Sequence, residues 1–186
     1  MKEESKTFIF SDVFKETLSL KQLNSATALY YNSFNSNPYA IPNMDTLEFM
    51  LSAKREKITF GPYKNLTFFE MSNRIYSDIV LLEAAQILFK TNKIKSVKLK
   101  MSNHSGNDIA VIDKSNNIIV GEAFNTANSY FQTKMRGELK KFNNNKKGII
   151  AFNKTALVGN ETFFENKKNQ FKNITFIICE GDTIKI

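Results

Sequence analysis

The sequence predicts a mixed α/β fold in which helices flank one central mixed sheet. From residue 77 onward, patterns typical of helices and strands follow one another in the order helix, three strands, helix, strand, helix, strand. The chain of 186 residues is 42% hydrophobic and 24% charged, ordinary values for a globular protein with one sizeable core. We therefore expect one domain over 1–186, with a mainly helical N-terminal extension over 7–76 and the core over 77–186.

The N-terminal third carries helical signals followed by a segment rich in turn formers. One helix is expected to start at Asp45, because Glu48 stands three residues later, as in a capping box. Lys57–Phe69 contains Gly61 and Pro62 among apolar residues, which indicates short strands or a loop. Two further helices are predicted at Ser11–Leu23 and Ser25–Phe34.

The core contains two expected long helices that differ in burial. Ser77–Lys90 is apolar on most sides and has one narrow polar stripe, so it is predicted to be mostly buried. The helix from about Ala127 to Phe142 has one apolar stripe, which is typical of a helix that covers a sheet. The polar stripe consists of Glu83, Gln86 and Lys90, and the apolar stripe of Phe131, Met135, Leu139 and Phe142.

Three consecutive antiparallel strands and two later ones complete the core. Val97, Leu99 and Met101 alternate with lysines, and this period of two indicates a half-exposed strand. The polar segment Asp113–Asn117 suits a hairpin between two short apolar runs. The remaining elements are expected as strands at Ile109–Ile112, Ile118–Val120, Gly148–Asn153 and Ile174–Cys179, and a short helix at Glu161–Phe171.

Composition narrows the classes of function. The formal net charge of +8 favours a polyanion such as nucleic acid as the partner. One histidine, one cysteine and no Gly-rich phosphate loop argue against Ser-His triads, zinc clusters and P-loop nucleotide binding. Cys179 lies in an apolar run and is predicted to be a buried strand residue. No apolar run approaches the roughly 18 residues of a membrane span, so we expect a cytoplasmic protein without membrane contact.

Two carboxylates in the central hairpin are the strongest candidates for chemistry. Asp108 opens the second core strand, and Glu122 lies near the end of the third, with 13 residues between them. In a hairpin these positions meet on one face, where two like charges favour binding of a divalent cation or sharing of a proton. Without a histidine cluster, an oxygen-ligand cation such as Mg²⁺ is favoured, with Mn²⁺ as its expected substitute. Such an ion supports hydrolysis of phosphodiesters.

This arrangement resembles the PD-(D/E)xK restriction-endonuclease superfamily over residues 77–153. The superfamily core is helix, three antiparallel strands, helix and strand, with Asp on the second strand and Glu-x-Lys on the third. Here Gly121-Glu122-Ala123-Phe124 has phenylalanine in place of the lysine. The resemblance implies a restriction-endonuclease-like core, in which Asp108, Glu122 and the backbone carbonyl of Ala123 hold Mg²⁺.

Other residues are candidates for supporting roles in the same site. Lys134, on the helix that follows the third strand, is expected to replace the missing lysine, and Glu138 stands beside it on the helical wheel. Glu83 corresponds to the extra carboxylate that many superfamily members carry on the first core helix. His104 lies in a polar loop that enters the site; loop histidines are usually solvated, and contact with a phosphate is the alternative for this one.

Lysines in two further segments are expected to contact DNA phosphates. They are Lys98 and Lys100 on one strand, and Lys140, Lys141, Lys146 and Lys147 after the long helix. Alternatively, these lysines are solvated or complement the helix dipole.

The chain's length, its helical N-terminal third and the Glu-Ala-Phe-Asn variant of the motif look like the small catalytic subunit of a heterodimeric type IIS restriction endonuclease. This resemblance implies double-stranded DNA as substrate and a large, site-specific nicking subunit as partner. Two alternatives stay open: a stand-alone homodimeric restriction nuclease, and a noncatalytic basic module that binds nucleic acid. Retention of the Asp108 and Glu122 pair favours the catalytic alternatives, because a pure binding module has no chemical need for it.

Overall fold

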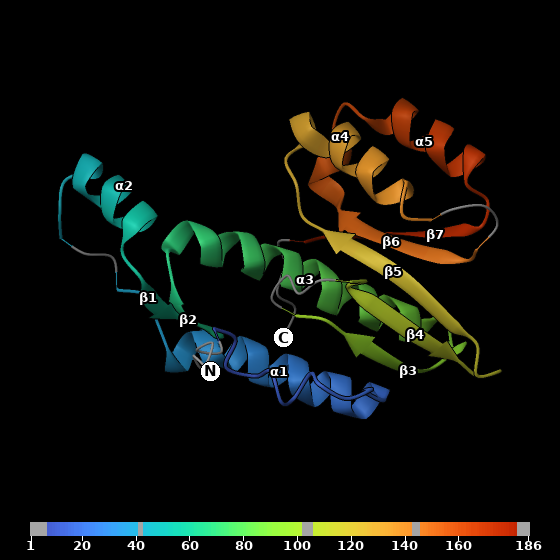
Figure 1. Cartoon of the computed structure of the whole chain (residues 1–186), viewed down its shortest axis with the longest axis horizontal. Helices are drawn as coiled ribbons and strands as arrows, with labels where there is room; N and C mark the ends of the chain where they lie inside the picture. Colours follow the sequence, from blue (N-terminus) through green and yellow to red (C-terminus); the bar gives the residue numbers. More distant parts are fainter. Residues whose placement is uncertain (1–6, 41–42, 102–105, 143–145, 182–186) are drawn as a thin grey trace, which may run out of the picture.

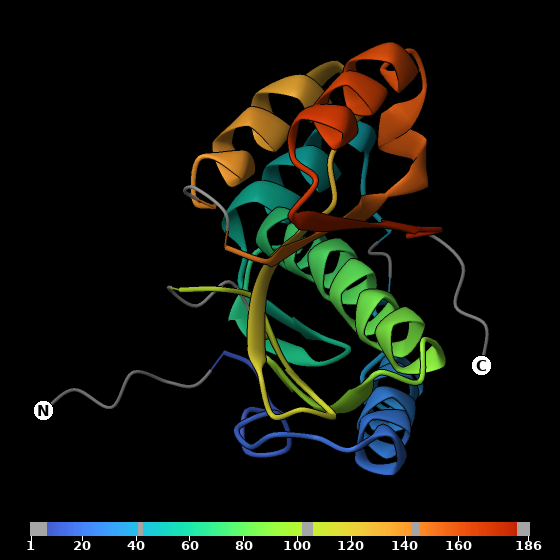
Figure 2. The same cartoon turned by 90° about the vertical axis from the view of Figure 1, so that its right-hand side faces the viewer.

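A computed structural model describes residues 7–40, 43–101, 106–142 and 146–181 of the chain. Its centre is a mixed five-stranded sheet with the strand order β3-β4-β5-β6-β7. Helix α3 covers one face of this sheet, and helices α4 and α5 cover the other (Figures 1 and 2). The described residues form five α-helices in all, so the expected mixed α/β class is confirmed.

The predicted order of core elements is also confirmed. Strands β3, β4 and β5 are antiparallel, whereas β6 pairs parallel to β5, and β7 parallel to β6. The 3-10 helix η1 precedes α5. The bounds are α3 Phe68–Lys90, β3 Ile94–Leu99, β4 Ile109–Asp113, β5 Ile118–Phe124, α4 Asn128–Leu139, β6 Gly148–Asn153, η1 Lys154–Leu157, α5 Glu161–Gln170 and β7 Ile174–Cys179.

The hairpin between β4 and β5 is closed by the predicted polar segment. The carboxylate of Asp113 accepts hydrogen bonds from the backbone N–H groups of Ser115 and Asn117, each at 2.8 Å. Asn116 adopts a positive φ of 61°, which asparagine tolerates better than most residues. These contacts set the register in which Ile109 pairs with Gly121 and Ile112 with Ile118.

Two apolar cores lie on the two faces of the sheet. On the α3 face, helix residues such as Val80 and Ala84 pack against inward residues of the strands, including Ile109, Ile149 and the buried Cys179. On the α4 face, the predicted helical stripe packs against Phe124, Ile150 and Phe152. The stripe residues Phe131, Met135, Leu139 and Phe142 are all buried, as expected. Burial of these side chains is the main term that holds both helical layers on the sheet.

Helix α3 begins well before Ser77. Thr67 caps it, because its side chain accepts from the N–H of Glu70 while the Glu70 carboxylate accepts from the N–H of Thr67. Met71 and Ile75 in the added turns are buried in the α3-side core. The predicted start at Ser77 was therefore wrong, and a boundary between 7–76 and 77–186 falls inside this helix.

The helix predicted at Ser11–Leu23 is not formed as such. Ser19 and Gln22 make a capping box that starts α1 (Leu20–Ser36), which continues through the separately predicted helix Ser25–Phe34. The preceding residues are turns, and Leu18 exchanges two backbone hydrogen bonds of 2.7 and 2.9 Å with Val97 on the open edge of β3. Pairing with a distant strand has overridden the weak helical pattern.

The rest of the N-terminal third agrees better with the prediction. Helix α2 (Thr46–Arg55) is capped by Asp45, whose carboxylate accepts from the N–H groups of Leu47 and Glu48. The segment 57–69, expected to form short strands or a loop, forms the strands β1 (Ile58–Phe60) and β2 (Tyr63–Leu66), which pair as an antiparallel hairpin.

A buried carboxylate joins three elements of this region. Asp78 on α3 is 3% exposed. Its Oδ2 accepts a hydrogen bond of 3.0 Å from the hydroxyl of Tyr30 on α1, and another from the hydroxyl of Tyr63 on β2. The N-terminal elements are thus tied to the sheet-covering helix by hydrogen bonds as well as by apolar contacts.

Within the described ranges, no helix combines the length and the apolar character needed to cross a bilayer.

Candidate active site

Asp108, directly before β4, and Glu122, on β5, lie side by side at the α4 face of the sheet. Glu122 is flanked by Gly121, which faces the opposite side, where an added Cβ would stand 2.6 Å from Cβ of Ile149. Glu122 itself pairs in register with Ile150, a residue of the α4-side core, and is 3% exposed. Asp108 directly precedes β4, and its carbonyl accepts from the N–H of Lys100 at 2.8 Å.

The two carboxylates are close enough to interact. Oδ2 of Asp108 accepts a hydrogen bond of 2.9 Å from the backbone N–H of Ala123, the residue after Glu122. The negative charge of Asp108 also contributes to a raised pKa of Glu122. The structure therefore brings the predicted pair together. The backbone carbonyl of Ala123 as a metal ligand stays a prediction, because the observed contact to Asp108 is made by its N–H.

Lys141, rather than Lys134, is the lysine that contacts Glu122. Its Nζ lies 2.8 Å from Oε2 of Glu122 and 2.6 Å from Oε2 of Glu138, so one ammonium group bridges two buried carboxylates. Lys134 Nζ lies 2.7 Å from Oε1 of Glu138 and 5.8 Å from the centre of the Phe124 ring. Lys134 thus pairs with Glu138, whereas Lys141 pairs with both Glu138 and Glu122.

The end of α4 explains this arrangement. The helix ends at Leu139, and the N–H groups of Lys141 and Phe142 then bond to the carbonyls of Glu138 and Leu139 in a tight turn. This turn buries Phe142 against the sheet and directs Lys141 back toward Glu122. The sequence assigned Lys141 only to phosphate contact; the usable signal was its spacing of three residues from Glu138, within reach of an ion pair.

The environment of the acidic pair raises both pKa values. Burial is the largest cause for Asp108, and it outweighs the hydrogen bond from Ala123 and the charge of Lys141, which lower the pKa. Burial also raises the pKa of Glu122, opposed by Lys141 and reinforced by the charge of Asp108. Carboxylates that are costly to ionise gain most from a nearby cation.

Glu138 behaves differently. Burial works against its ionisation, but Lys134 and Lys141 together lower its pKa below the ordinary value. The pKa of Lys141 is raised, because hydrogen bonds and attraction to Glu122 and Glu138 outweigh its desolvation. Because half of the Lys141 side chain is exposed (50%), solvent reaches the ammonium group that contacts Glu122 and Glu138.

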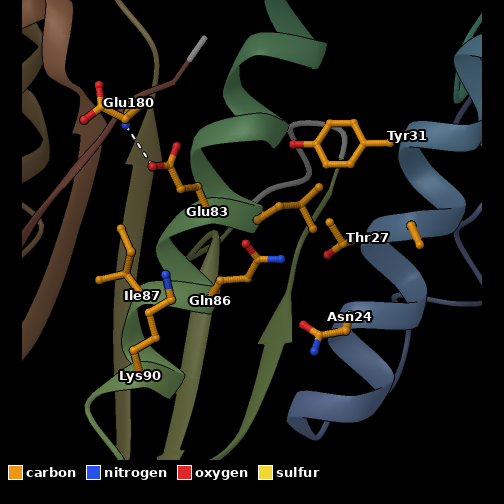
Figure 3. A pocket seen from close by; sticks show the side chains of 10 residues that line it. Asn24, Thr27, Tyr31, Glu83, Gln86, Ile87, Lys90 and Glu180 are labelled. Carbon is orange, nitrogen blue, oxygen red and sulfur yellow. Dashed lines mark hydrogen bonds between the residues drawn. The ribbon is translucent and has the colours of Figure 1, made fainter. Parts of the chain in front are cut away.

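Glu83 is not part of this cluster. It lies on α3, across the sheet from Glu122, and its carboxylate accepts from the backbone N–H groups of Glu180 at 2.9 Å and Gly181 at 3.1 Å. Figure 3 shows it at the side of a cavity of about 380 Å³ between α1 and α3, with Gln86 and Thr27 facing each other across the gap. Its contacts hold the end of β7 and do not support the role of a metal ligand beside Asp108.

A basic hollow lies along β5, and Lys141, the lysine that contacts Glu122, is part of its lining. It has a volume of about 560 Å³ and contains Lys141, Lys146 and Lys147 together with Asn107 and Asn117. Lys98 is exposed on β3, and its in-register partner is Ala110 on the α4 face, so Lys98 and Lys100 point to the same face as Asp108. Lys140 is exposed but does not line the hollow. His104 lies outside the described residues.

The donor set fits a hard divalent cation better than a soft one. In the described part of the chain, no three His, Cys, Asp or Glu side chains converge closely enough to form a ready-made metal site. The partly buried Asp108 and the buried Glu122 nevertheless supply carboxylate oxygens, the ligands that Mg²⁺ and Mn²⁺ prefer. The ammonium group of Lys141 already occupies the position of a cation between Glu122 and Glu138.

Comparison of the chain with protein-family models, with curated proteins and with solved structures found no match. The site is therefore interpreted from its own geometry and chemistry.

Proposed function

We propose that this chain is a metal-dependent DNA endonuclease with a restriction-endonuclease-like core. The observation that carries the proposal is the pairing of the partly buried Asp108, directly before β4, with the buried Glu122 on β5, beside a lysine that is open to solvent. Two further features support it. The order α3, β3, β4, β5, α4, β6 and the antiparallel pairing of β3, β4 and β5 are those that the superfamily resemblance implies. The basic hollow offers a path for the phosphate backbone.

Each residue of the proposed site has a distinct role. Asp108 and Glu122, with the carbonyl of Ala123, would hold Mg²⁺. When bound, the ion would supply Lewis-acid activation of the phosphodiester and of water. Lys141 takes the role that the sequence assigned to Lys134: its ammonium group donates to the phosphate oxygens and stabilises the negative charge of the transition state. Lys98, Lys100, Lys146 and Lys147 position the DNA backbone.

The resemblance to the small subunit of a heterodimeric type IIS enzyme adds a partner to this proposal. The chain would cut one strand of double-stranded DNA, while a large subunit recognises the site and nicks the other strand. A stand-alone homodimeric nuclease is the alternative, in which a second copy supplies the second active site.

Cleavage of supercoiled plasmid DNA in Mg²⁺ tests the proposal. The chain is assayed alone and with a candidate recognition subunit, as wild type, as Glu122→Gln and as the matched control Glu165→Gln on the exposed face of α5. We expect Glu122→Gln to lower the cleavage rate by about 1000-fold, since it removes a carboxylate that holds the metal ion. The control should cut like the wild type.

Metal binding gives a second readout that does not depend on activity. Calorimetric titration with Mn²⁺ should detect binding to the wild type and to Glu165→Gln, and much weaker binding to Glu122→Gln. Equal cleavage and equal Mn²⁺ binding by all three proteins would refute the assignment of Glu122 and with it the proposed centre.

A further inference from the structure

Helix α2 presents an apolar stripe to solvent on a part of the molecule that projects from the body. Leu47, Met50 and Leu51 are 70%, 49% and 40% exposed. With Lys54 they follow the spacing of three and four residues that places side chains on one helical face. Figure 1 shows α2 beyond the N-terminal end of α3, at the far side of the molecule from α4.

The opposite face of α2 already has a partner. Phe49 packs against Phe68 at the start of α3, with ring centres 6.2 Å apart, and Ala53 is buried. The helix is therefore held on α3 by its inner face, whereas the outer stripe remains between 40% and 70% exposed in the described part of the chain. Isolated exposed leucines are ordinary on protein surfaces, but three large apolar residues in one stripe indicate an interface.

The charges that flank the stripe indicate what it binds. Glu48 and Arg55 are seven residues apart, so they lie on the same flank of the helix, near its opposite ends, and both are exposed. When two identical helices pair antiparallel about a two-fold axis, each flank meets the same flank of the other helix. Glu48 of one copy then faces Arg55 of the other, twice per interface, and Leu51 lies close to the axis.

We propose that α2 is a self-complementary interface that pairs two copies of this chain antiparallel. The apolar stripes pack together along the axis, and the Glu48–Arg55 pairs set the register and the direction. Helix α2 lies apart from α4, so the pairing helix is not one of the elements that form the site of Asp108 and Glu122 (Figure 1). The inference stands apart from the proposed chemistry, and a recognition subunit can still bind elsewhere.

Charge reversal tests the interface directly. The mass of the full chain is measured by sedimentation or light scattering over a dilution series, for the wild type, Glu48→Arg, Arg55→Glu and the double reversal. Each single reversal places like charges opposite each other twice and should weaken self-association by about tenfold or more. The double reversal restores opposite charges and should restore association.

Two leucine substitutions test whether association depends on the α2 stripe or on any exposed leucine. Leu51→Lys should abolish association, whereas Leu29→Lys changes a comparably exposed leucine on α1 (42%) and should leave it unchanged. Circular dichroism checks that each variant is folded. A wild type that is monomeric throughout, or that binds only a recognition subunit through α2, would overturn the proposal, and so would a double reversal no better than the single ones.

Discussion

Asp78 and Glu122 are both 3% exposed, yet they occupy opposite kinds of environment. Asp78 lies between α1, β2 and α3 and accepts hydrogen bonds from the hydroxyls of Tyr30 and Tyr63. Those donors are neutral and buried, and the pKa of Tyr30 is raised well above its ordinary value by burial and by the charge of Asp78. Glu122 is instead satisfied by the ammonium group of Lys141, which is half exposed.

The difference separates a structural carboxylate from one suited to chemistry. Tyrosine hydroxyls fixed by packing cannot leave Asp78 without opening the core, so that network holds elements together. A lysine side chain can move into solvent at little cost, so its place beside Glu122 can pass to another cation while the ammonium group turns to a phosphate. Burial of a carboxylate alone therefore does not indicate a functional role. A partner that another group can replace does.

The largest expected difference between the two carboxylates is in stability. Asp78→Ala leaves two tyrosine hydroxyls buried without their acceptor and should lower the free energy of unfolding by about 3 kcal/mol. Glu122→Gln should change it by less than about 1 kcal/mol, because Lys141 keeps Glu138 as a partner and reaches solvent. Urea denaturation measures both. Comparable losses of unfolding free energy in the two variants would contradict this difference between Asp78 and Glu122.

The next expected effect concerns the two lysines of the site. Lys141→Met should slow Mg²⁺-dependent cleavage by about 100-fold, since it removes the ammonium group beside Glu122. Lys134→Met removes only a contact to Glu138 and should cost less than about tenfold. Single-turnover cleavage at saturating DNA compares them. A larger loss of cleavage rate in Lys134→Met than in Lys141→Met would favour Lys134 as the lysine of the site, as the sequence predicted.

The smallest expected effect is the pH dependence of stability. The pKa of Asp108 is raised, so its folded state favours the protonated form, and that advantage is lost as pH rises through the raised pKa. At neutral pH, Asp108→Asn should therefore be slightly more stable than the wild type. The difference should vanish below pH 3.8, the ordinary value of the aspartate pKa.

In the same cluster, Glu138 should change the stability of the fold with pH in the opposite direction. Its pKa is lowered by Lys134 and Lys141 against the effect of burial, so it stabilises the fold above pH 4.5, the ordinary value. Glu138→Gln should be less stable than the wild type at neutral pH, and the loss should fade as pH drops through the lowered pKa. Urea midpoints from pH 3 to pH 8, the span over which these carboxyls change charge, test both variants. The same sign for both would contradict the electrostatic description.

The core elements were predictable because their signals are local. The bounds expected for β6 and β7 are those observed, since each is a short apolar run bordered by polar residues. The meeting of Asp108 and Glu122 followed from the register of a hairpin whose turn lies in five consecutive residues, Asp113–Asn117. Periodicity and turn chemistry determined these features without reference to the rest of the chain.

Contacts between distant segments decided what the sequence missed. Leu18 pairs with Val97 instead of extending a helix, and the carboxylate of Glu83 bonds to the N–H of Glu180, 97 residues later. The choice between Lys134 and Lys141 depended on where α4 stops and how Phe142 is buried, which brings Lys141 back to Glu122. The sequence by itself determined the order of the core elements and the meeting of Asp108 with Glu122. Only the tertiary structure decided which cation faces them, because long side chains find their partners only when the backbone is in place.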